Sequence, residues 1–234
     1  MGERLDKFLA SQGLGTRKEV GKLIRSGAVL VNGAPQRDPG AKVEPGADRV
    51  TAQGEEIRYQ EFLTIMLNKP AGVLSATEDR RQKTVLDLLP EGLRRRGLFP
   101  AGRLDKDTTG LLLITDDGEL AHKMLSPKSH VYKQYRAQLD APVEEADIQA
   151  FAAGVAWEGE QYAPARLWVE QDPRAAFVEI REGRFHQVKR MFQARGKTVL
   201  QLKRLKIGGL WLDSTLQEGG CRLLTPQEIQ AIFH

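Results

Sequence analysis

The sequence predicts an α+β protein with two domains, and three observations support this fold class. The chain has 234 residues, of which 41% are hydrophobic, and this is enough to build more than one packed core. Strand-like segments outnumber helix-like ones and do not alternate regularly with them, which favours a mainly antiparallel, mixed sheet. The polar stretch 53–61 is typical of a linker, so we place a small domain at 1–58 and a larger one at 62–234.

The small domain begins with two predicted helices. Apolar residues recur at helical spacing within 5–9 and again within 20–24. Thr16 is a typical N-cap for the second helix, and Gly27 is a typical stop. A turn signal at 32–33 follows a short apolar run. The strands that we expect in this domain are 28–31 and 48–52.

The larger domain is predicted to hold most of the strands. Pro70 ends the first of them, because proline lacks the backbone donor that a strand needs. Asp117 supplies an acidic first turn that is typical of a helix start. The strands that we expect are 63–67, 111–115, 130–139, 167–170, 177–181 and 198–207. The helices that we expect are 84–89, 117–125, 143–153, 186–194 and 226–233.

Positive charge is concentrated in two parts of the chain, although the net charge is only +4. Residues 184–206 include eight basic side chains and no acidic one, whereas 140–182 is strongly acidic. This segregation creates a one-sided field that suits a polyanion such as nucleic acid, although a solvated charged face has the same composition. The polar side of the first two predicted helices is also basic, through Arg4, Lys7, Arg17, Lys18, Lys22 and Arg25.

The composition argues against several classes of protein. The longest apolar runs are far shorter than a membrane span, and the start MGERLDKFLA lacks the apolar centre of a signal peptide. We therefore expect a cytoplasmic protein that does not associate with membranes. The single cysteine, Cys221, excludes an intramolecular disulfide, and the four histidines show no zinc-ligand spacing. We expect no bound metal.

One polar turn, GRLDKDTTG at 102–110, runs directly into the apolar run 111–114. An apolar run bounded by glycines predicts a buried strand, and a polar turn beside it is either solvated or used in chemistry. Asp107 precedes threonines that are typical of a capped turn, whereas Asp105 beside Arg103 is a candidate catalytic carboxylate. The spacing does not decide between these interpretations. A glycosidase pair of Asp105 and Asp107 is a further alternative, although two residues so close on a turn need not face each other.

The small domain resembles a known RNA-binding domain. Its stretches RLDKFLA at 4–10 and TRKEVGKLIRSGAVLVNG at 16–33 are similar to the S4 domain, which is found on several RNA-modifying enzymes. This resemblance implies that the paired helices bind structured RNA. The RNA contacts that it implies are Arg4, Lys7, Arg17, Lys18 and Arg25.

The larger domain resembles the RsuA-type branch of the pseudouridine synthases, through four motifs in the order in which that family has them. They are MLNKPAG at 66–72, GRLDKDTTGLLLITDDGELA at 102–121, KQYR at 133–136 and EGRFHQVKRMF at 182–192. Together with the S4-like domain, the resemblance covers nearly the whole chain. The sequences HQVKRMF and DTTG are most similar to the enzymes that act on small-subunit (16S) ribosomal RNA.

The resemblance implies that the protein isomerises uridine to pseudouridine in RNA without a cofactor. It makes Asp105 the catalytic carboxylate, as nucleophile or base, and it places Lys189 close enough to keep Asp105 ionised. Tyr135 is expected against the uracil, and Arg103 is expected to fill the space that an extruded base leaves. A core position in an amphipathic strand is the alternative for Tyr135.

The resemblance also implies further contacts with RNA and a partner. Phe185 and Phe192 are expected either to stack on bases or to lie in the core, and His186 is expected to be structural. The partner is ribosomal RNA or the assembling small ribosomal subunit, bound by a monomer. An RNA-binding protein without catalysis is the alternative, which the intact motifs disfavour. The further RNA contacts are Lys69, for which a solvated turn is the alternative, and Lys133, Arg184, Gln187 and Arg190.

Overall fold

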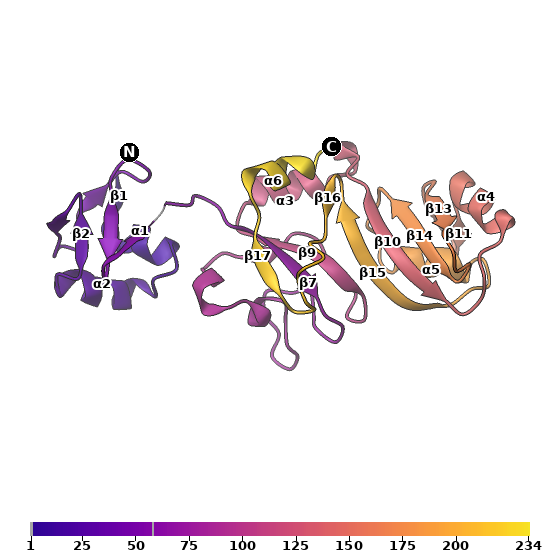
Figure 1. Ribbon diagram of the computed structural model, residues 1–234, viewed down its shortest axis with the longest axis horizontal. Coiled ribbons are helices and arrows are strands. Elements are labelled where there is room, and N and C mark those ends of the chain that lie inside the picture. Colours follow the sequence, from indigo (N-terminus) through magenta and orange to yellow (C-terminus); the bar gives the residue numbers. More distant parts are fainter. Residues whose placement is uncertain (1, 58) are drawn as a thin grey trace. The chain divides into compact units, whose positions relative to one another are not determined.

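The computed structural model describes residues 2–57 and 59–234, and these form two compact units. Figure 1 shows the course of the chain and the labels of its elements. The segment Leu89–Leu98 groups with the first unit, although it lies within the part of the sequence that we assigned to the larger domain. The first unit comprises the chain up to Phe62 together with Leu89–Leu98, and the second comprises Leu63–Leu88 and Phe99–His234.

The first unit packs helices α1 (Leu5–Ser11) and α2 (Arg17–Arg25) against a small sheet, around one apolar core. Helix α2 begins at a capping box, because the side chain of Thr16 accepts from the N–H of Glu19 and the Glu19 carboxylate accepts from the N–H of Thr16. Within the described residues the sheet has four antiparallel strands in the order β3-β2-β5-β6, and β1 pairs with β4. The bounds are β1 Glu3–Arg4, β2 Val29–Val31, β3 Ala34–Pro35, β4 Lys42–Val43, β5 Val50–Ala52, β6 Glu55–Ile57, and the 3₁₀ turn η2 Glu91–Leu93.

Part of the stretch that we predicted as a linker is a strand. Strand β6 pairs with β5, and the two-residue turn between them has φ angles of 53° at Gln53 and 87° at Gly54. A tight hairpin requires positive φ at both positions, and glycine adopts it without strain. Strand β6 lies at the edge of the sheet, where exposed glutamates are tolerated. Its two glutamates remove the apolar pattern by which a strand is predicted. The predicted limits of the small domain, Met1 and Arg58, lie outside the described residues.

The second unit is built on a mixed sheet that, across the fully described range 63–234, has nine strands. The strand order is β13-β14-β10-β15-β9-β7-β17, with β16 paired to β15 and β8 paired to β9. In this range β15 and β9 run parallel, and the other strand pairs of the sheet are antiparallel. The predicted α+β fold with a mainly antiparallel sheet is therefore confirmed. The bounds are β7 Thr64–Lys69, β8 Phe99–Pro100, β9 Thr109–Thr115, β10 Lys133–Leu139, β13 Arg166–Val169, β14 Ala175–Ile180, β15 Val199–Ile207, β16 Leu210–Trp211 and β17 Cys221–Leu223.

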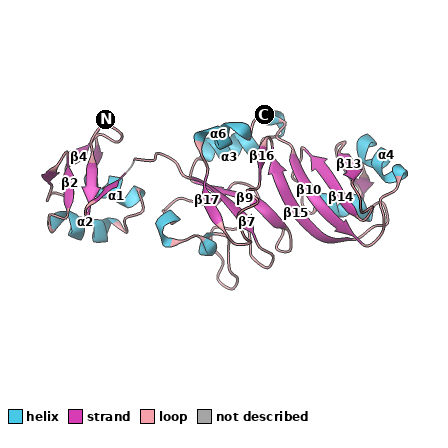
Figure 2. Cartoon of the chain, viewed as in Figure 1, coloured by secondary structure: helices cyan, strands magenta, loops and turns pink. Residues whose placement is uncertain are grey.

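Helices α3 and α6 lie together beside the sheet, as Figure 2 shows. They share a core with the buried side chains of Met66, Leu111 and Leu113. Asp117 caps α3 as predicted, since its carboxylate accepts from the N–H of Leu120 at 2.9 Å. Among the described residues, no helix combines the length and apolar character needed to cross a bilayer. The helices of this unit are α3 Gly118–Leu125, α4 Glu145–Ala153, α5 Gln187–Gln193 and α6 Pro226–Ala231.

Several elements differ from the prediction. The stretch 84–89 forms only the 3₁₀ turn η1 (Leu86–Leu88), because the Asp87 carboxylate accepts from the N–H and the hydroxyl of Thr84 and closes a single turn. Strand β10 begins after His130, whose φ of 52° is left-handed. In the second unit, several short elements without periodicity were not predicted from the sequence. They are β8, β16, β17, the hairpin of β11 (Ala156–Trp157) and β12 (Glu160–Gln161), and the 3₁₀ turn η3 (Pro127–Ser129).

Gly110 joins the polar loop to β9 and lies directly against β15. Its φ is 98°, and a Cβ atom there would overlap the backbone carbonyl oxygen of Arg204. We expect Gly110→Ala to reduce the free energy of unfolding by about 2–4 kcal/mol, because the parallel pairing of β9 and β15 must open. Gly118→Ala is the matched control, since its Cβ meets nothing within 4 Å, and we expect a change within about 0.5 kcal/mol. Equal denaturation midpoints for the two variants would contradict this account.

Candidate active site

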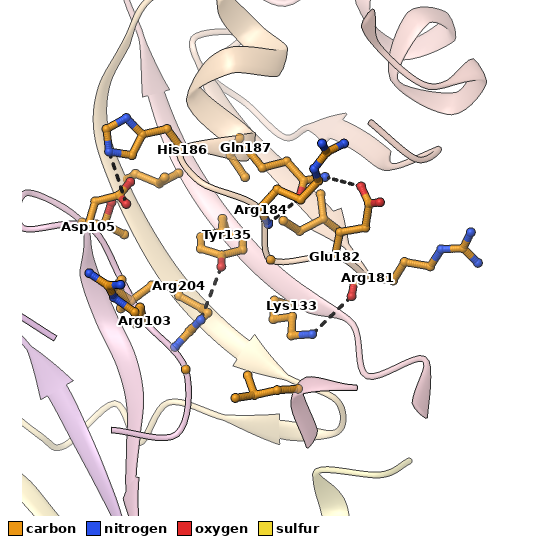
Figure 3. A pocket seen from close by; sticks show the side chains of 18 of the residues that line it. Arg103, Asp105, Lys133, Tyr135, Arg181, Glu182, Arg184, His186, Gln187 and Arg204 are labelled. Atoms are coloured by element: carbon orange, nitrogen blue, oxygen red, sulfur yellow. Dashed lines mark hydrogen bonds and ion pairs between the residues drawn. The ribbon is translucent and has the colours of Figure 1, made fainter. Parts of the chain in front are cut away.

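A cavity of about 750 Å³ lies between the central strands and two loops of the second unit. The strands are β10 and β15, and the loops are 102–108 and 181–188. Figure 3 shows the labelled side chains around this cavity. The fold thus brings together motifs that lie far apart in the sequence. The predicted site residues that line the cavity are Arg103, Asp105, Lys133, Tyr135, Arg184 and Gln187.

A buried lysine holds the loop that carries Asp105. Lys69, at the end of β7, is 0% exposed, and burial lowers the pKa of its ammonium group to about 8. Backbone carbonyl oxygens surround this group and supply the acceptors that a buried cation needs. The RNA contact predicted for Lys69 is therefore wrong, because no surface leads from its ammonium group to a phosphate. The carbonyls within reach of Nζ are those of Pro70 (3.0 Å), Asp105 (3.1 Å), Lys106 (3.2 Å) and Thr108 (2.9 Å).

The segment after β7 fixes the same loop through two further residues. The hydroxyl of Ser75 donates to the Leu104 carbonyl at 2.8 Å and accepts from the Leu104 N–H at 3.1 Å. The N–H of Gly72 donates to the carbonyl of Lys106 at 2.8 Å. The first motif of the larger domain therefore acts as a scaffold for the second.

The carboxylate of Asp105 lies between two basic side chains. Its Oδ2 is 3.5 Å from Nζ of Lys189, and its Oδ1 is 3.5 Å from Nε2 of His186, which Figure 3 marks with a dashed line. Lys189 lies closer to Asp107, at 2.6 Å from Oδ1, and this hydrogen bond lowers the pKa of Asp107. The ammonium group of Lys189 therefore forms ion pairs with both Asp105 and Asp107. The structure places Lys189 beside Asp105, as the resemblance implies.

His186, which the sequence analysis expected to be structural and did not place in the site, lies beside Asp105. Its φ of 52° is left-handed, and it directly precedes α5. Its ring stacks on Phe185 with centroids 3.7 Å apart, and its Nε2 faces Asp105. The sequence carries no signal for this contact, because it arises only when the two loops fold against each other.

Tyr135 lies in the cavity wall on β10 and is 7% exposed. Its hydroxyl accepts from Nη1 of Arg204 at 3.4 Å, and the Nε of Arg204 donates to the carbonyl of Leu111 at 2.7 Å. Lys133 lies two residues before Tyr135, and its ammonium group donates to the Arg181 carbonyl at 3.2 Å. Tyr135 is thus buried, as the core alternative supposes, but it also lines the cavity. Arg204 is a second residue that the sequence analysis did not single out.

The loop 181–188 is held by side chains of its own motif. Gln187 is 3% exposed, its Nε2 donates to Oε2 of Glu182 at 2.9 Å, and its Oε1 accepts from the N–H of Arg184 at 3.2 Å. Gln187 therefore shapes the loop, and because it also lines the cavity, its contact with RNA stays a prediction. Arg184 itself is exposed, and its guanidinium lies 3.1 Å from the Glu160 carboxylate.

The two phenylalanines of this motif have different environments. Phe192 is fully buried, with its ring centroid 4.9 Å from that of Phe151, so it belongs to the core. Phe185 is 67% exposed, and the guanidinium of Arg190 lies 5.2 Å from its ring centroid. Stacking on a base stays a prediction for Phe185 and is wrong for Phe192.

The remaining predicted RNA contacts are exposed. Arg103 lines the cavity, and among the described residues no hydrogen bond or ion pair holds its side chain. In the first unit, Arg4 and Arg17 lie 3.0 and 2.9 Å from the Asp6 carboxylate. Hydrogen bonding, first of all from Arg4, lowers the pKa of Asp6 to about 2. The other exposed basic residues predicted on this unit are Lys7, Lys18 and Arg25.

The site combines the half-buried carboxylate of Asp105 with an excess of basic side chains, and the other acidic side chain of its lining, Glu182, accepts from Gln187. In residues 2–57 and 59–234, no three His, Cys, Asp or Glu side chains are grouped so that they could hold a metal ion. A carboxylate in a cationic cavity, together with a separate basic unit, is the arrangement of an enzyme that acts on RNA.

The chain belongs to the RNA pseudouridylate synthase family, whose model matches residues 63–194, and an S4 domain model matches residues 3–48. It is 46% identical to the uncharacterized RNA pseudouridine synthase YtzG of Bacillus subtilis, over 98% of both chains. It is 42% identical to ribosomal small subunit pseudouridine synthase A of Escherichia coli (strain K12), over 98% of this chain and 99% of that one. A crystal structure of a pseudouridylate synthase matches with a TM-score of 0.68 at 39% identity, over 98% of this chain and 99% of that one. The predicted family is confirmed.

Lys69→Met tests whether the buried ammonium group holds the catalytic loop. We expect the free energy of unfolding to fall by at least about 2 kcal/mol, because the loop carbonyls lose their buried donor. Lys106→Met is the matched control, since Lys106 is exposed and its Nζ donates to Oε1 of Gln82 at 2.7 Å. Denaturant unfolding of both variants measures the difference, and a Lys69 variant as stable as the control would refute the role.

Asp105→Asn and Asp107→Asn separate the two carboxylates of the loop. We expect Asp105→Asn to lower the rate of pseudouridine formation by more than about a thousandfold, because the amide is neither a nucleophile nor a base. Asp107 is 73% exposed, so we expect Asp107→Asn to keep the rate within about tenfold. Tritium release from C5-labelled RNA measures both rates. Equal losses in the two variants would contradict the assignment.

Proposed function

We propose that this protein converts one uridine of small-subunit (16S) ribosomal RNA into pseudouridine, with Asp105 acting at the ribose of an extruded nucleotide. The observation that carries the proposal is the position of Asp105, half-buried in a cavity and flanked by Lys189 and His186. Membership of the pseudouridylate synthase family supports the reaction. Identity of 42% with ribosomal small subunit pseudouridine synthase A, over nearly the full length, supports the choice of RNA.

The reaction breaks the bond between ribose C1′ and N1, turns the uracil, and joins C1′ to C5. It involves no net oxidation and no hydrolysis, so it requires no cofactor. It does require an ionised carboxylate near the sugar, as nucleophile or as base. Lys189 places its ammonium group 3.5 Å from the Asp105 carboxylate.

A uracil in folded RNA is stacked, so it must leave the stack to reach Asp105 at a cost of a few kcal/mol. The cavity of about 750 Å³ has the size of a small-molecule site and accommodates one base with its ribose. Tyr135 presents its ring to the base. Arg103 is exposed and unheld among the described residues, which suits a side chain that fills the vacated space.

The exposed basic residues of the first unit serve to hold the RNA. Arg4, Arg17 and the other exposed cations of the first unit lie in the region that the S4 domain model matches. We assign RNA binding to the domain at 1–58 and catalysis to the domain at 62–234. The partner is ribosomal RNA or the assembling small subunit, and the protein acts as a monomer in the cytoplasm.

Mapping pseudouridines in ribosomal RNA tests the proposal directly. Cells without this protein are expected to lack one pseudouridine in 16S RNA, and the wild-type gene restores it. A gene encoding Asp105→Asn is the control, and it leaves the position unmodified because RNA binding alone does not isomerise uridine. Restoration by this variant would favour a non-catalytic role, and a loss confined to 23S RNA would refute the choice of RNA.

A further inference from the structure

Two buried cations of the cavity wall have no carboxylate partner among the described residues. Lys133 is 7% exposed and Arg204 is 5% exposed, and both line the cavity. Within the described part of the chain, neither Lys133 nor Arg204 forms an ion pair. The carboxylate of Asp105, which lines the same cavity, lies near Lys189 and His186 instead. Buried charges in proteins are normally paired or bind a ligand. This part of the wall therefore suits a ligand that brings oxygen atoms and negative charge.

Both side chains keep hydrogen-bond donors unused. The ammonium group of Lys133 has three protons, and the acceptor found for it among the described residues is the Arg181 carbonyl. Arg204 uses Nε and Nη1, but its Nη2 is buried and finds no hydrogen-bond partner in the described part of the chain. An unpaired buried donor is costly, and a ligand oxygen that reaches it removes that cost. Figure 3 shows Arg204 beside Tyr135.

The strand register places the two cations around Tyr135. Lys133 and Tyr135 lie two residues apart on β10, so their side chains project to the same face of the sheet. Arg204 is the direct partner of Tyr135 on β15, with its guanidinium carbon 6.0 Å from the centre of the tyrosine ring. A planar base stacked on Tyr135 therefore has a cation near each of two edges.

We infer that Lys133 and Arg204 bind the two carbonyl oxygens, O2 and O4, of the extruded uracil and stabilise the negative charge that the base carries during the reaction. This inference rests on the proposed function and adds the contacts that select and activate the base. Burial, together with the positive charge of Arg204, lowers the pKa of Lys133 to about 8. An anionic base beside both cations relieves their repulsion, and Lys133 is still mostly protonated at neutral pH.

The charge on the base follows from the bonds that change. When C1′–N1 breaks, its electron pair stays on the uracil, whose negative charge spreads over N1, O2 and O4, and C1′ is left electron-poor beside Asp105. C5 then bonds to C1′, C5 loses its proton, and N1 gains one, so the product has the atoms and electrons of uridine. Donors that are fixed where charge develops lower the barrier.

The same contacts discriminate between pyrimidines. Cytosine has an amino group in place of O4, and this group is a donor that neither Lys133 nor Arg204 can accept from. A site built to donate to a substrate oxygen rejects an analogue that lacks it, because buried donors are left unpaired. Uracil, with two carbonyl oxygens, satisfies both cations.

RNA with single-atom changes tests the inference. The substrates are the 16S fragment that contains the mapped uridine and the same fragment with 2-thiouridine or 4-thiouridine at that position, because sulfur is a weaker acceptor than oxygen. The enzymes are the wild type, Lys133→Gln and Arg204→Gln, with Lys203→Gln as the control. Lys203 precedes Arg204 on β15 and projects to the opposite face. Pseudouridine formation gives kcat and kcat/KM for each pair.

With uridine, we expect each cavity variant to lose roughly 10- to 100-fold in kcat/KM relative to the wild type. For each variant, one of the two thiouridines lowers kcat/KM little further, because the contact that the sulfur atom weakens is already missing. The Lys203 variant keeps both the wild-type rate and the wild-type sensitivity to sulfur. The inference would be overturned if, in both cavity variants and with both thiouridines, the loss from the substitution and the loss from sulfur multiplied. The cations would then act elsewhere, for instance on a phosphate. Arg204→Lys replaces Arg204→Gln if circular dichroism shows that the latter is unfolded. A wild-type enzyme that is inactive on uridine would instead overturn the proposed function, and the inference with it.

Discussion

The buried ammonium group of Lys69 is the contact on which the site depends, because it gives a polar loop a fixed shape. Carbonyl oxygens of Asp105, Lys106 and Thr108 converge on it at 2.9–3.2 Å. Without this donor the Thr108 carbonyl would lose its hydrogen bond to Lys69, and the Asp105 and Lys106 carbonyls would keep only those from the N–H groups of Thr108 and Gly72 among the described residues, which costs free energy in a buried setting. These hydrogen bonds offset the cost of removing the ammonium group from water. The carboxylate of Asp105 is therefore placed by the backbone of its own loop before any RNA arrives.

The charges around that carboxylate divide into two sets with different tasks. Lys189 and His186 flank the Asp105 carboxylate, each 3.5 Å from one of its oxygens, on the side of the cavity proposed for the sugar. Lys133 and Arg204 lie behind Tyr135 and meet no carboxylate among the described residues, so their charge is available to the base. Separation of this kind lets one cavity hold an anion at the sugar while it stabilises negative charge on the ring.

The sequence predicts the larger sheet well, because strands such as 111–115 are apolar and bounded by glycine and proline signals. It misses β6, since an edge strand with two glutamates has the composition of a linker. Motif resemblance places Asp105 and Tyr135 in one site, but it does not show that Lys69 turns inward to the loop carbonyls. His186 and Arg204 are missed for a related reason: their partners lie far away in the sequence, and only the packing of loops and the register of β10 and β15 bring them together.

A crystal structure of the protein with substrate RNA that carries 5-fluorouridine at the target position tests the central claim most directly. The account predicts an everted nucleotide in the cavity, with the Asp105 carboxylate about 3 Å from the ribose C1′ or from an atom attached to it. It also predicts that the loop carbonyls still bind Lys69 as they do in the free protein. An Asp105 carboxylate directed into solvent, away from any everted base, would contradict the account.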